Sequence, residues 1–157
     1  MKLINKFKSP NFDSRKSSKI SFIIIHYTAL KNNETAISYL CKSSNKVSAH
    51  FLISQKGEIY NLVSEKKRAW HAGISFWKNY TDINSYSIGI ELDFSSHKSN
   101  NKFSNVMMKS LKELIKYLKE KYYINNSDIL GHSDIAPYRK KDPGNKFPWN
   151  TLSSSNL

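Results

Sequence analysis

The apolar residues of this chain fall into short runs separated by turn-forming residues, and such runs predict strands more often than helices. Residues 20–25 are almost continuously apolar, so they predict a buried strand that ends at His26. Residues 34–42 instead repeat their apolar positions at helical spacing, with Cys41 among them. This second stretch predicts a short amphipathic helix that places Cys41 in the core.

A hairpin and one further strand are predicted in the middle of the chain. Residues 50–54 and 58–63 are strand-like and are joined by a short link that contains Gly57, which can take the positive φ of a tight turn. Residues 86–93 alternate between apolar and polar positions and predict another strand. Within that strand, Gly89 indicates a bulge or a close approach by another part of the chain.

The longest helix is expected between residues 105 and 123, where apolar positions form one stripe and lysines fill the other face. The stripe consists of Met107, Leu111, Leu114, Ile115, Leu118 and Tyr122. A short strand is predicted at residues 128–130. Residues 70–84 are rich in aromatic and turn-forming residues without either periodicity, so they predict a long loop, and residues 95–102 predict a polar one.

The order of the predicted elements is strand, helix, hairpin, strand, long helix and strand. This order predicts an α/β fold in a single domain, with a mixed central β-sheet and flanking helices. We expect residues 1–19 to form a lead-in segment that lies over the domain, residues 20–152 to form the domain itself, and residues 153–157 to form a tail.

Composition narrows the class of protein. The net charge of +13 suggests nucleic-acid binding, but the cations are 22 Lys and only 3 Arg, and arginine carries most base and phosphate recognition. We therefore expect no nucleic-acid partner. No apolar run is long enough to span a membrane, and the N-terminus lacks the apolar core of a signal peptide. These features favour a cytoplasmic monomer over a periplasmic or membrane protein, and the single Cys41 excludes an internal disulfide.

The block from Gly131 to Gly144 contains the residue types of a metal site. His132 follows a predicted strand, and Asp142 precedes a Pro-Gly turn that fixes the direction of its carboxylate. A catalytic zinc site needs three protein ligands and leaves the fourth position to water. His26 is the best third ligand, because a rigid buried strand can direct its last side chain at the sheet edge. The chain therefore predicts one zinc ion.

Two charged residues beside these ligands are candidates for catalysis. Glu91 lies between apolar residues of a strand, where a carboxylate is costly to bury without a partner and where burial raises its pKa. Such a group suits a general base. Lys140, two residues before Asp142, is expected on the same side of the segment, where it can stabilise an oxyanion. Arg139 is expected to face the other way, although basic residues around a cleft also suit an acidic substrate.

Arg139 is a candidate substrate contact, and so are three more residues, His50, His71 and Trp70. His50 begins a strand and His71 lies in the aromatic loop, so either can line a cleft, orient a metal ligand, or serve the structure alone. Trp70, with Phe76, Trp77 and Tyr80 in the same loop, is a candidate wall for a sugar ring. An aromatic cluster of this kind is at least as often part of a core.

Five segments together resemble a known family in order and spacing. They are Phe22–Thr28, Val47–Ile53, Arg68–Gly73, Ser87–Leu92 and the block from Gly131 to Trp149. The chain resembles the zinc-dependent N-acetylmuramoyl-L-alanine amidases of the type 2 amidase family. That family includes the bacterial peptidoglycan-recycling amidases and is related to phage lysozyme-amidases and peptidoglycan recognition proteins. Ala49 and Asp142 stand where phage and animal relatives commonly carry tyrosine and cysteine, which groups this chain with the bacterial enzymes.

The resemblance implies zinc ligands at His26, His132 and Asp142, with Glu91 and Lys140 as catalytic groups. It also implies a hydrolase that cleaves the amide between N-acetylmuramic acid, including its 1,6-anhydro form, and the L-alanine of peptidoglycan stem peptides. The expected partners are muropeptides, in cell-wall degradation or recycling. The alternative is a peptidoglycan-binding module without catalysis, which the intact ligand positions and Glu91 disfavour.

Overall fold

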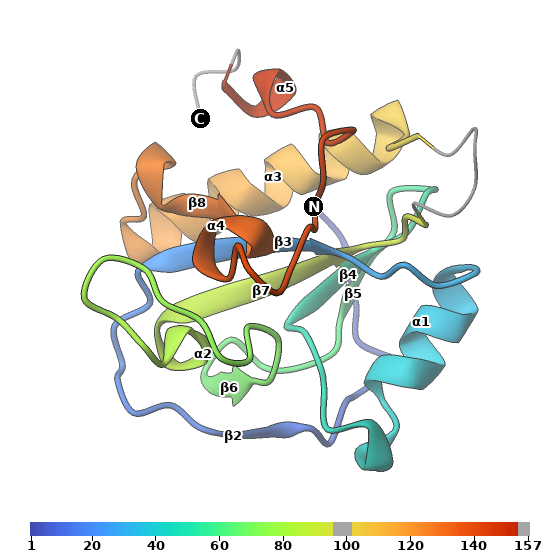
Figure 1. Ribbon diagram of the computed structural model, residues 1–157. Coiled ribbons are helices and arrows are strands. Elements are labelled where there is room, and N and C mark those ends of the chain that lie inside the picture. The colour runs from blue at the N-terminus through green and yellow to red at the C-terminus, as the bar shows by residue number, and fades with distance from the viewer. Residues whose placement is uncertain (96–101, 154–157) are drawn as a thin grey trace.

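The computed structural model describes residues 1–95 and 102–153. Within these ranges a six-stranded sheet has the order β1-β5-β4-β7-β3-β8, and a separate two-stranded sheet pairs β2 with β6 (Figure 1). The six strands comprise β1 (Leu3–Ile4), β3 (Phe22–Tyr27), β4 (Phe51–Ile53), β5 (Ile59–Asn61), β7 (Ser87–Leu92) and β8 (Ile129–Gly131). The small sheet comprises β2 (Phe12–Ser14) and β6 (Lys67–Ala69). The predicted loop around residue 97, and all but the first residue of the predicted tail, lie outside the described residues.

The large sheet is mixed, as predicted. Its strands pair in parallel except for β4 and β5, which form an antiparallel hairpin. Gly57 in the hairpin turn has φ of +78°, a conformation that glycine adopts without strain. The parallel register pairs His26 of β3 with Glu91 of β7, so these two side chains point to the same face of the sheet.

Helices cover both faces of the sheet. In Figure 1, α3 (Asn105–Tyr122) lies above the central strands and α1 (Asn33–Leu40) lies below them. Shorter helices are α2 (Ile83–Tyr86), α4 (His132–Ile135) and α5 (Asn150–Ser153), with 3-10 turns η1 (Ser43–Asn45) and η2 (Asn126–Asp128). The sequence pattern did not predict these short elements or β6, because they are too brief for a periodic signal. No helix among the described residues is long and apolar enough to cross a bilayer.

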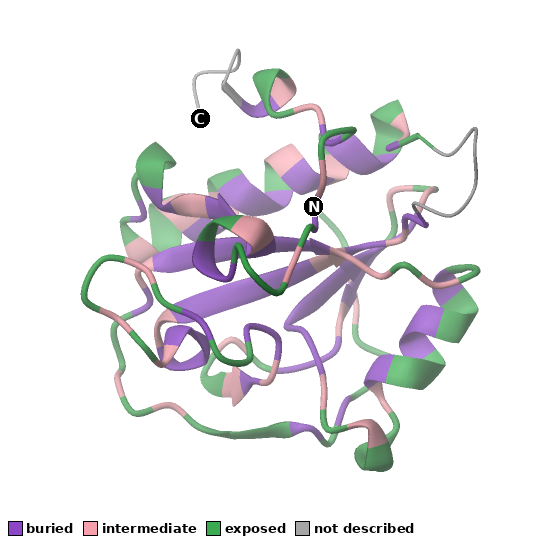
Figure 2. Cartoon of the chain, in the orientation of Figure 1, coloured by how far each residue is buried: buried purple, intermediate pink, exposed green. Residues whose placement is uncertain are grey.

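The apolar stripe of α3 packs on one face of the sheet, which we call the helix face. There it joins Ile23 and Ile25 of β3 and Ile88 and Ile90 of β7 in the largest core cluster. The opposite face carries Phe22, Ile24 and His26 of β3, and we call it the site face. Figure 2 shows that the central strands are buried between the layers on both sides. A strand covered on both faces is expected to be apolar nearly throughout, as β3 is.

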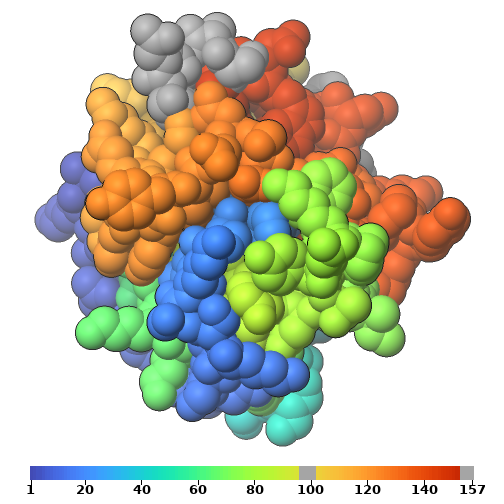
Figure 3. All heavy atoms as spheres, turned by 90° about the vertical axis from the view of Figure 1, so that its left-hand side faces the viewer, coloured from blue at the N-terminus to red at the C-terminus, as the bar shows by residue number. Residues whose placement is uncertain are grey.

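The first nineteen residues do not simply lie over the domain, as the sequence suggested. β1 extends the large sheet beside β5, and β2 pairs with β6. Figure 3 shows this blue segment packed against both the orange and the yellow-green parts of the chain. The pattern missed these strands because they are only two and three residues long, too short to show a period. Cys41 also differs from expectation: it is only partly buried, at the end of α1.

Candidate metal centre and active site

Three side chains from distant parts of the sequence converge on the site face. His26 comes from β3, His132 is the first residue of α4, and Asp142 lies in the following turn. The Nδ1 atoms of the two histidines are 2.9 Å apart, and Asp142 Oδ2 lies 3.0 Å from Nδ1 of His26 and 3.1 Å from Nδ1 of His132. Ligand atoms around a tetrahedral zinc ion lie about 3.3 Å from one another. The three atoms are therefore spaced as ligands of one small cation, and the cluster can hold a metal ion.

The protonation of this cluster suits a metal. Burial lowers the pKa of His26 to about 4, so its imidazole is neutral near pH 7 and has a lone pair to donate. Two imidazoles and one carboxylate form a donor set that zinc accepts.

Hydrogen bonds behind the cluster set which nitrogen of each ring faces it. Nε2 of His132 lies 3.0 Å from the carbonyl oxygen of Ala72, which only accepts, so Nε2 carries the proton and Nδ1 keeps its lone pair. Nε2 of His26 lies 3.1 Å from Nδ1 of His71. Both histidines thus present Nδ1 to Asp142 and are held from behind through Nε2.

Glu91 extends from β7 on the same face, one strand away from His26. Its Oε2 atom is buried and has no hydrogen-bond partner among the described residues. Burial, with a smaller contribution from Asp142, raises the pKa of Glu91 to about 8, while the charge of Lys140 acts in the opposite direction. A carboxyl group with an unused oxygen and a pKa near neutrality is suited to exchange protons with a reactant.

Of Lys140 and Arg139, only Arg139 lies differently from the expectation. Lys140 is half-buried and acts electrostatically on both Glu91 and His26, so it lies on the expected side. Arg139 does not face away: its Nη2 donates to the carbonyl oxygens of Ala72 and Ile74, both at 2.7 Å, and lies 3.4 Å from Nε2 of His132. The segment forms a turn at residues 137–139 instead of extended chain, which redirects Arg139 toward the site.

His50 does not line an open cleft. It is fully buried, its Nδ1 accepts from the backbone N–H of Gly89 at 3.0 Å, and its Nε2 lies 3.0 Å from the carbonyl oxygen of Lys67. Both ring nitrogens are therefore occupied inside the protein. Burial lowers its pKa to about 3, so the ring is neutral. His50 therefore has the structural role that was one of its alternatives, and His71 is likewise buried; substrate contact by either histidine stays a prediction.

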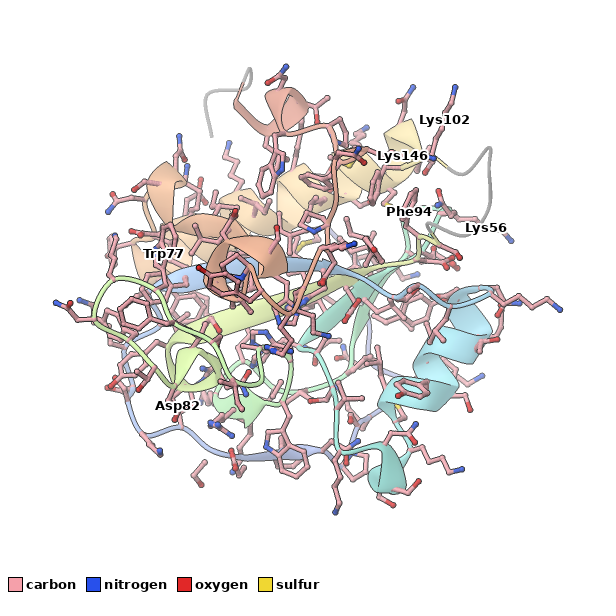
Figure 4. All side chains as sticks on the ribbon, viewed as in Figure 1. Lys56, Trp77, Asp82, Phe94, Lys102 and Lys146 are labelled. Carbon is pink, nitrogen blue, oxygen red and sulfur yellow. The ribbon has the colours of Figure 1, made fainter. Side chains whose placement is uncertain are left out.

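The aromatic residues of the long loop divide between core and surface. Trp77, labelled in Figure 4, and Tyr80 are partly buried and pack against the core cluster of Phe22 and Ile24, the alternative role that the sequence left open for them. Phe76 has 59 % of its surface exposed. Trp70 is half-buried, and its indole Nε1 has no partner in the part of the chain that the structure describes. Phe76 and Trp70 therefore remain as candidate surfaces for a substrate.

Sequence reasoning missed the residues that support the site from behind, chiefly Asn84, Ser87 and Arg15. Oδ1 of Asn84 accepts from the backbone N–H groups of His71 and Ala72. Arg15 donates to the carbonyl oxygens of Ser87, Asn84 and Ser85 at 2.9 to 3.0 Å. One signal was present, because Ser87, Gly89 and Glu91 alternate along β7 and interrupt its apolar pattern on one face only.

A cluster of two histidines and an aspartate beside a glutamate with a buried oxygen is an arrangement that metal-dependent hydrolases use. Residues 16–145 match the family model described as N-acetylmuramoyl-L-alanine amidase, and the chain belongs to that family. The family predicted from the five sequence segments is confirmed.

Two relatives indicate where the chain lies within the family. It is 34 % identical to the N-acetylmuramoyl-L-alanine amidase AmiD of Escherichia coli (strain K12), over 88 % of this chain and 54 % of that protein. It is also 34 % identical to the 1,6-anhydro-N-acetylmuramyl-L-alanine amidase AmpD of Haemophilus influenzae, over 96 % of this chain and 90 % of that protein. The chain therefore spans about half of the first relative and nearly all of the second.

Solved structures agree with the fold. AmiD from Escherichia coli, in complex with the substrate anhydro-N-acetylmuramic acid-L-Ala-D-gamma-Glu-L-Lys, has a TM-score of 0.80 and 34 % identity, covering 89 % of this chain and 59 % of that chain. AmpDh3 from Pseudomonas aeruginosa, in complex with anhydromuramic pentapeptide, has a TM-score of 0.78 and 32 % identity, covering 88 % of this chain and 62 % of that chain. The predicted α/β fold is confirmed.

Proposed function

We propose that this chain hydrolyses the amide between N-acetylmuramic acid and the L-alanine of peptidoglycan stem peptides, with one zinc ion held by His26, His132 and Asp142. The observation that carries the proposal is the convergence of their three ligand atoms, 2.9 to 3.1 Å apart, beside Glu91 on the adjacent strand. An amide is stable at neutral pH, so its hydrolysis needs an activated water, a proton carrier and support for the oxyanion.

The donor set favours zinc over magnesium or calcium. The latter two prefer oxygen ligands, whereas two imidazole nitrogens and a single carboxylate are typical of catalytic zinc. Bound zinc supplies a Lewis acid that lowers the pKa of water to about 7 and polarises a carbonyl group. The tautomers fixed by Ala72 and His71 keep both Nδ1 lone pairs directed at that position.

Glu91 moves the proton in this proposal. Its unpartnered Oε2 takes a proton from the attacking water and returns it to the nitrogen of the leaving L-alanine. A pKa raised to about 8 keeps the protonated form accessible for that second transfer, while the charge of Lys140 favours the ionised form that begins the reaction. Lys140 also supplies a positive charge to the oxyanion of the tetrahedral intermediate.

The substrate class follows from the family and from the rim of the site. Relatives with 34 and 32 % identity have been solved with anhydromuramyl peptides, which supports muropeptides that include the anhydro sugar. The rim offers the charge of Arg139 for an acidic stem peptide and the exposed ring of Phe76 for an apolar or sugar face.

The test is to incubate the purified protein with a defined anhydro-muropeptide and to identify the products by mass spectrometry. One sample is treated with a chelator, and a second is treated and then given back zinc. We expect free stem peptide only where zinc is present. Glu91→Gln should retain one zinc per chain and lose turnover. A protein that binds zinc and the muropeptide but leaves every tested muropeptide intact would instead be a binding module.

A further inference from the structure

A chain of buried hydrogen bonds runs from His26 back into the protein. Nε2 of His26 lies 3.1 Å from Nδ1 of His71, Nε2 of His71 lies 3.2 Å from Oγ of Ser87, and that oxygen lies 2.6 Å from the carbonyl oxygen of Ile83. The exposed fractions of His26, His71 and Ser87 are 1 %, 6 % and 0 %. No step of this chain depends on solvent.

The chain has only one consistent direction. The carbonyl of Ile83 cannot donate, and two oxygens 2.6 Å apart need a proton between them, so the hydroxyl of Ser87 donates to Ile83. Oγ of Ser87 then accepts from Nε2–H of His71. A neutral imidazole carries one proton, so Nδ1 of His71 has a lone pair and accepts from Nε2–H of His26. Nδ1 of His26 is left with its lone pair directed at Asp142.

We propose that His71 and Ser87 are positioning residues of the metal centre, which fix His26 in the tautomer that binds zinc through Nδ1. The inference rests on the ligand role of His26 in the proposed function. His71 cannot itself replace His26 as the ligand, because it contacts the nitrogen of His26 on the opposite side of the ring from Asp142. Neither residue touches the substrate in this role.

The surrounding structure holds the His71 ring in place. Gly89 lies directly against it: a Cβ atom at Gly89 would be 2.4 Å from Cγ of His71, so any side chain there would displace the ring. Asn84 accepts from the backbone N–H groups of both His71 and Ala72. Since Ala72 in turn accepts from His132, this two-residue segment supports both histidine ligands. Partners of metal-bound histidines commonly have this orienting function.

Burial keeps the chain in its neutral form. His71 is only 6 % exposed, so a charged ring there would lack the hydration that stabilises it. A neutral His71 has one donor and one acceptor nitrogen, as the directional chain requires. A charged ring would donate through both nitrogens and would oppose the proton on Nε2 of His26.

The tautomer of His26 can be measured directly in the protein without metal. Two-bond ¹H–¹⁵N correlation spectra of ¹⁵N-histidine-labelled protein distinguish a proton on Nε2 from a proton on Nδ1. In the wild type we expect His26 to carry its proton on Nε2. In His71→Phe, which keeps an aromatic ring but removes the acceptor, the Nδ1–H form should become populated. Zinc affinity, measured by chelator competition, should fall about 10- to 100-fold.

His71→Asn is the variant expected to rescue the defect of His71→Phe. The asparagine Oδ1 takes nearly the position of the histidine Nδ1 and can accept from His26, but it does not reach Ser87. We expect His71→Asn to keep the Nε2–H tautomer of His26 and to recover most of the zinc affinity that His71→Phe loses. A role in packing alone predicts the reverse, because phenylalanine fills the site better than asparagine.

Ser87→Ala tests the far end of the chain, with Ser85→Ala as its matched control. Both serines are fully buried, and Oγ of Ser85 donates to Asp82 instead of joining the chain. Ser87→Ala should populate the second tautomer of His26 and weaken zinc binding less than His71→Phe does, whereas Ser85→Ala should change neither. This pair keeps the proposal testable if His71→Phe fails to fold.

The proposal is overturned if Ser87→Ala leaves the tautomer and zinc affinity equal to those of Ser85→Ala, or if a folded His71→Phe retains wild-type zinc affinity. Both readouts are independent of substrate. An expected tautomer and metal response in a protein that cleaves no muropeptide would reject the proposed function and keep this inference. Turnover of muropeptide with an unchanged tautomer of His26 in every variant would keep the proposed function and reject this inference.

Discussion

The two faces of the central sheet are built on different principles. On the helix face, Ile23, Ile25, Ile88 and Ile90 meet the apolar stripe of α3 in one contiguous cluster. On the site face, the same two strands present His26 and Glu91. Apolar contacts are non-directional, so the helix face is held by buried area. Polar groups need particular partners at particular distances, so the polar part of the site face depends on its network of hydrogen bonds.

The two faces should therefore tolerate different amino-acid substitutions. A smaller side chain on the helix face leaves a cavity and lowers stability, while the contacts of the metal ligands stay intact. A change on the site face removes one partner from a network and leaves other groups unsatisfied. Four experiments test this separation between stability and function, and they follow in decreasing order of expected effect.

Glu91→Gln should separate the two properties most strongly. The amide cannot accept a proton, so we expect turnover of muropeptide to fall about 10³-fold. Zinc content, measured by elemental analysis, should remain one per chain, because none of the three ligands is changed. Near-normal turnover in this variant would remove Glu91 from the mechanism.

Leu114→Ala should affect the helix face alone. Leu114 is fully buried in α3, and we expect its truncation to lower the free energy of unfolding by about 3 kcal/mol in a denaturant titration. The zinc affinity of the folded protein should stay within about twofold of the wild type. Val106→Ala, at a position 56 % exposed on the same helix, is the control and should change stability by less than about 0.5 kcal/mol. A large loss of zinc affinity in Leu114→Ala would show that the faces are coupled.

The pH dependence of stability should reveal the cost of Glu91 on the site face. Its pKa rises from 4.5 to about 8 in the folded protein. Between pH 4.5 and about 8, Glu91 keeps its proton in the native state but has released it in the unfolded chain. The contribution of Glu91 to the free energy of unfolding is therefore fully present below pH 4.5 and is lost as the pH rises to about 8. Glutamine does not titrate. In chelated protein, Glu91→Gln should therefore gain stability over wild type between pH 5 and 8, by about 2 kcal/mol after discounting for solvent screening.

Thermal unfolding of both proteins across that pH range measures the difference. A constant offset between the two curves would mean that Glu91 titrates at its ordinary pKa in the folded protein. Zinc must be absent from both samples, because a bound cation favours the ionised carboxylate and reduces the difference.

Asp82→Asn should have the smallest effect. Asp82, labelled in Figure 4, pairs with Arg68 at 2.8 Å and with Lys16 at 3.2 Å, and Arg68 also contacts Asp13 across β2 and β6. These groups are partly exposed, so the loss should be below about 1 kcal/mol and should shrink further in high salt. A loss above about 2 kcal/mol, by urea titration at low salt, would show that this network anchors the loop behind the site.

Sequence reasoning succeeded where a local pattern was strong. The period of α3, the turn at Gly57 and the apolar run of β3 were each legible over several residues, and the structure confirms them. Gly89 was also correctly marked as a close approach, because glycine weakens the interior of a strand and is favoured there where another group needs the space of a side chain. The strands of the first nineteen residues were missed, since two or three residues are too few to show a period.

In the candidate site, too, sequence reasoning succeeded for residues that stand out from a local pattern and failed for the others. His26, His132, Asp142 and Glu91 were identifiable because each is polar at a position where the local pattern predicts burial or a fixed turn. Arg139 was assigned the wrong direction, because the alternation of an extended segment was assumed where the chain turns. His50 and His71 could not be told apart by sequence, as both are histidines beside apolar residues. The two histidines differ in the partners of their ring nitrogens in the folded protein.

Local patterns along the chain were sufficient to predict the main strand and helix periods, the mixed α/β class, the family and the residue types of the site. Only the tertiary structure decided that three ligand atoms converge, that His71 lies behind His26, and that Ser87 ends the chain of hydrogen bonds at a backbone carbonyl. The physical reason is that periodicity is local along the chain, whereas the tautomer of a histidine depends on partners 45 and more residues away.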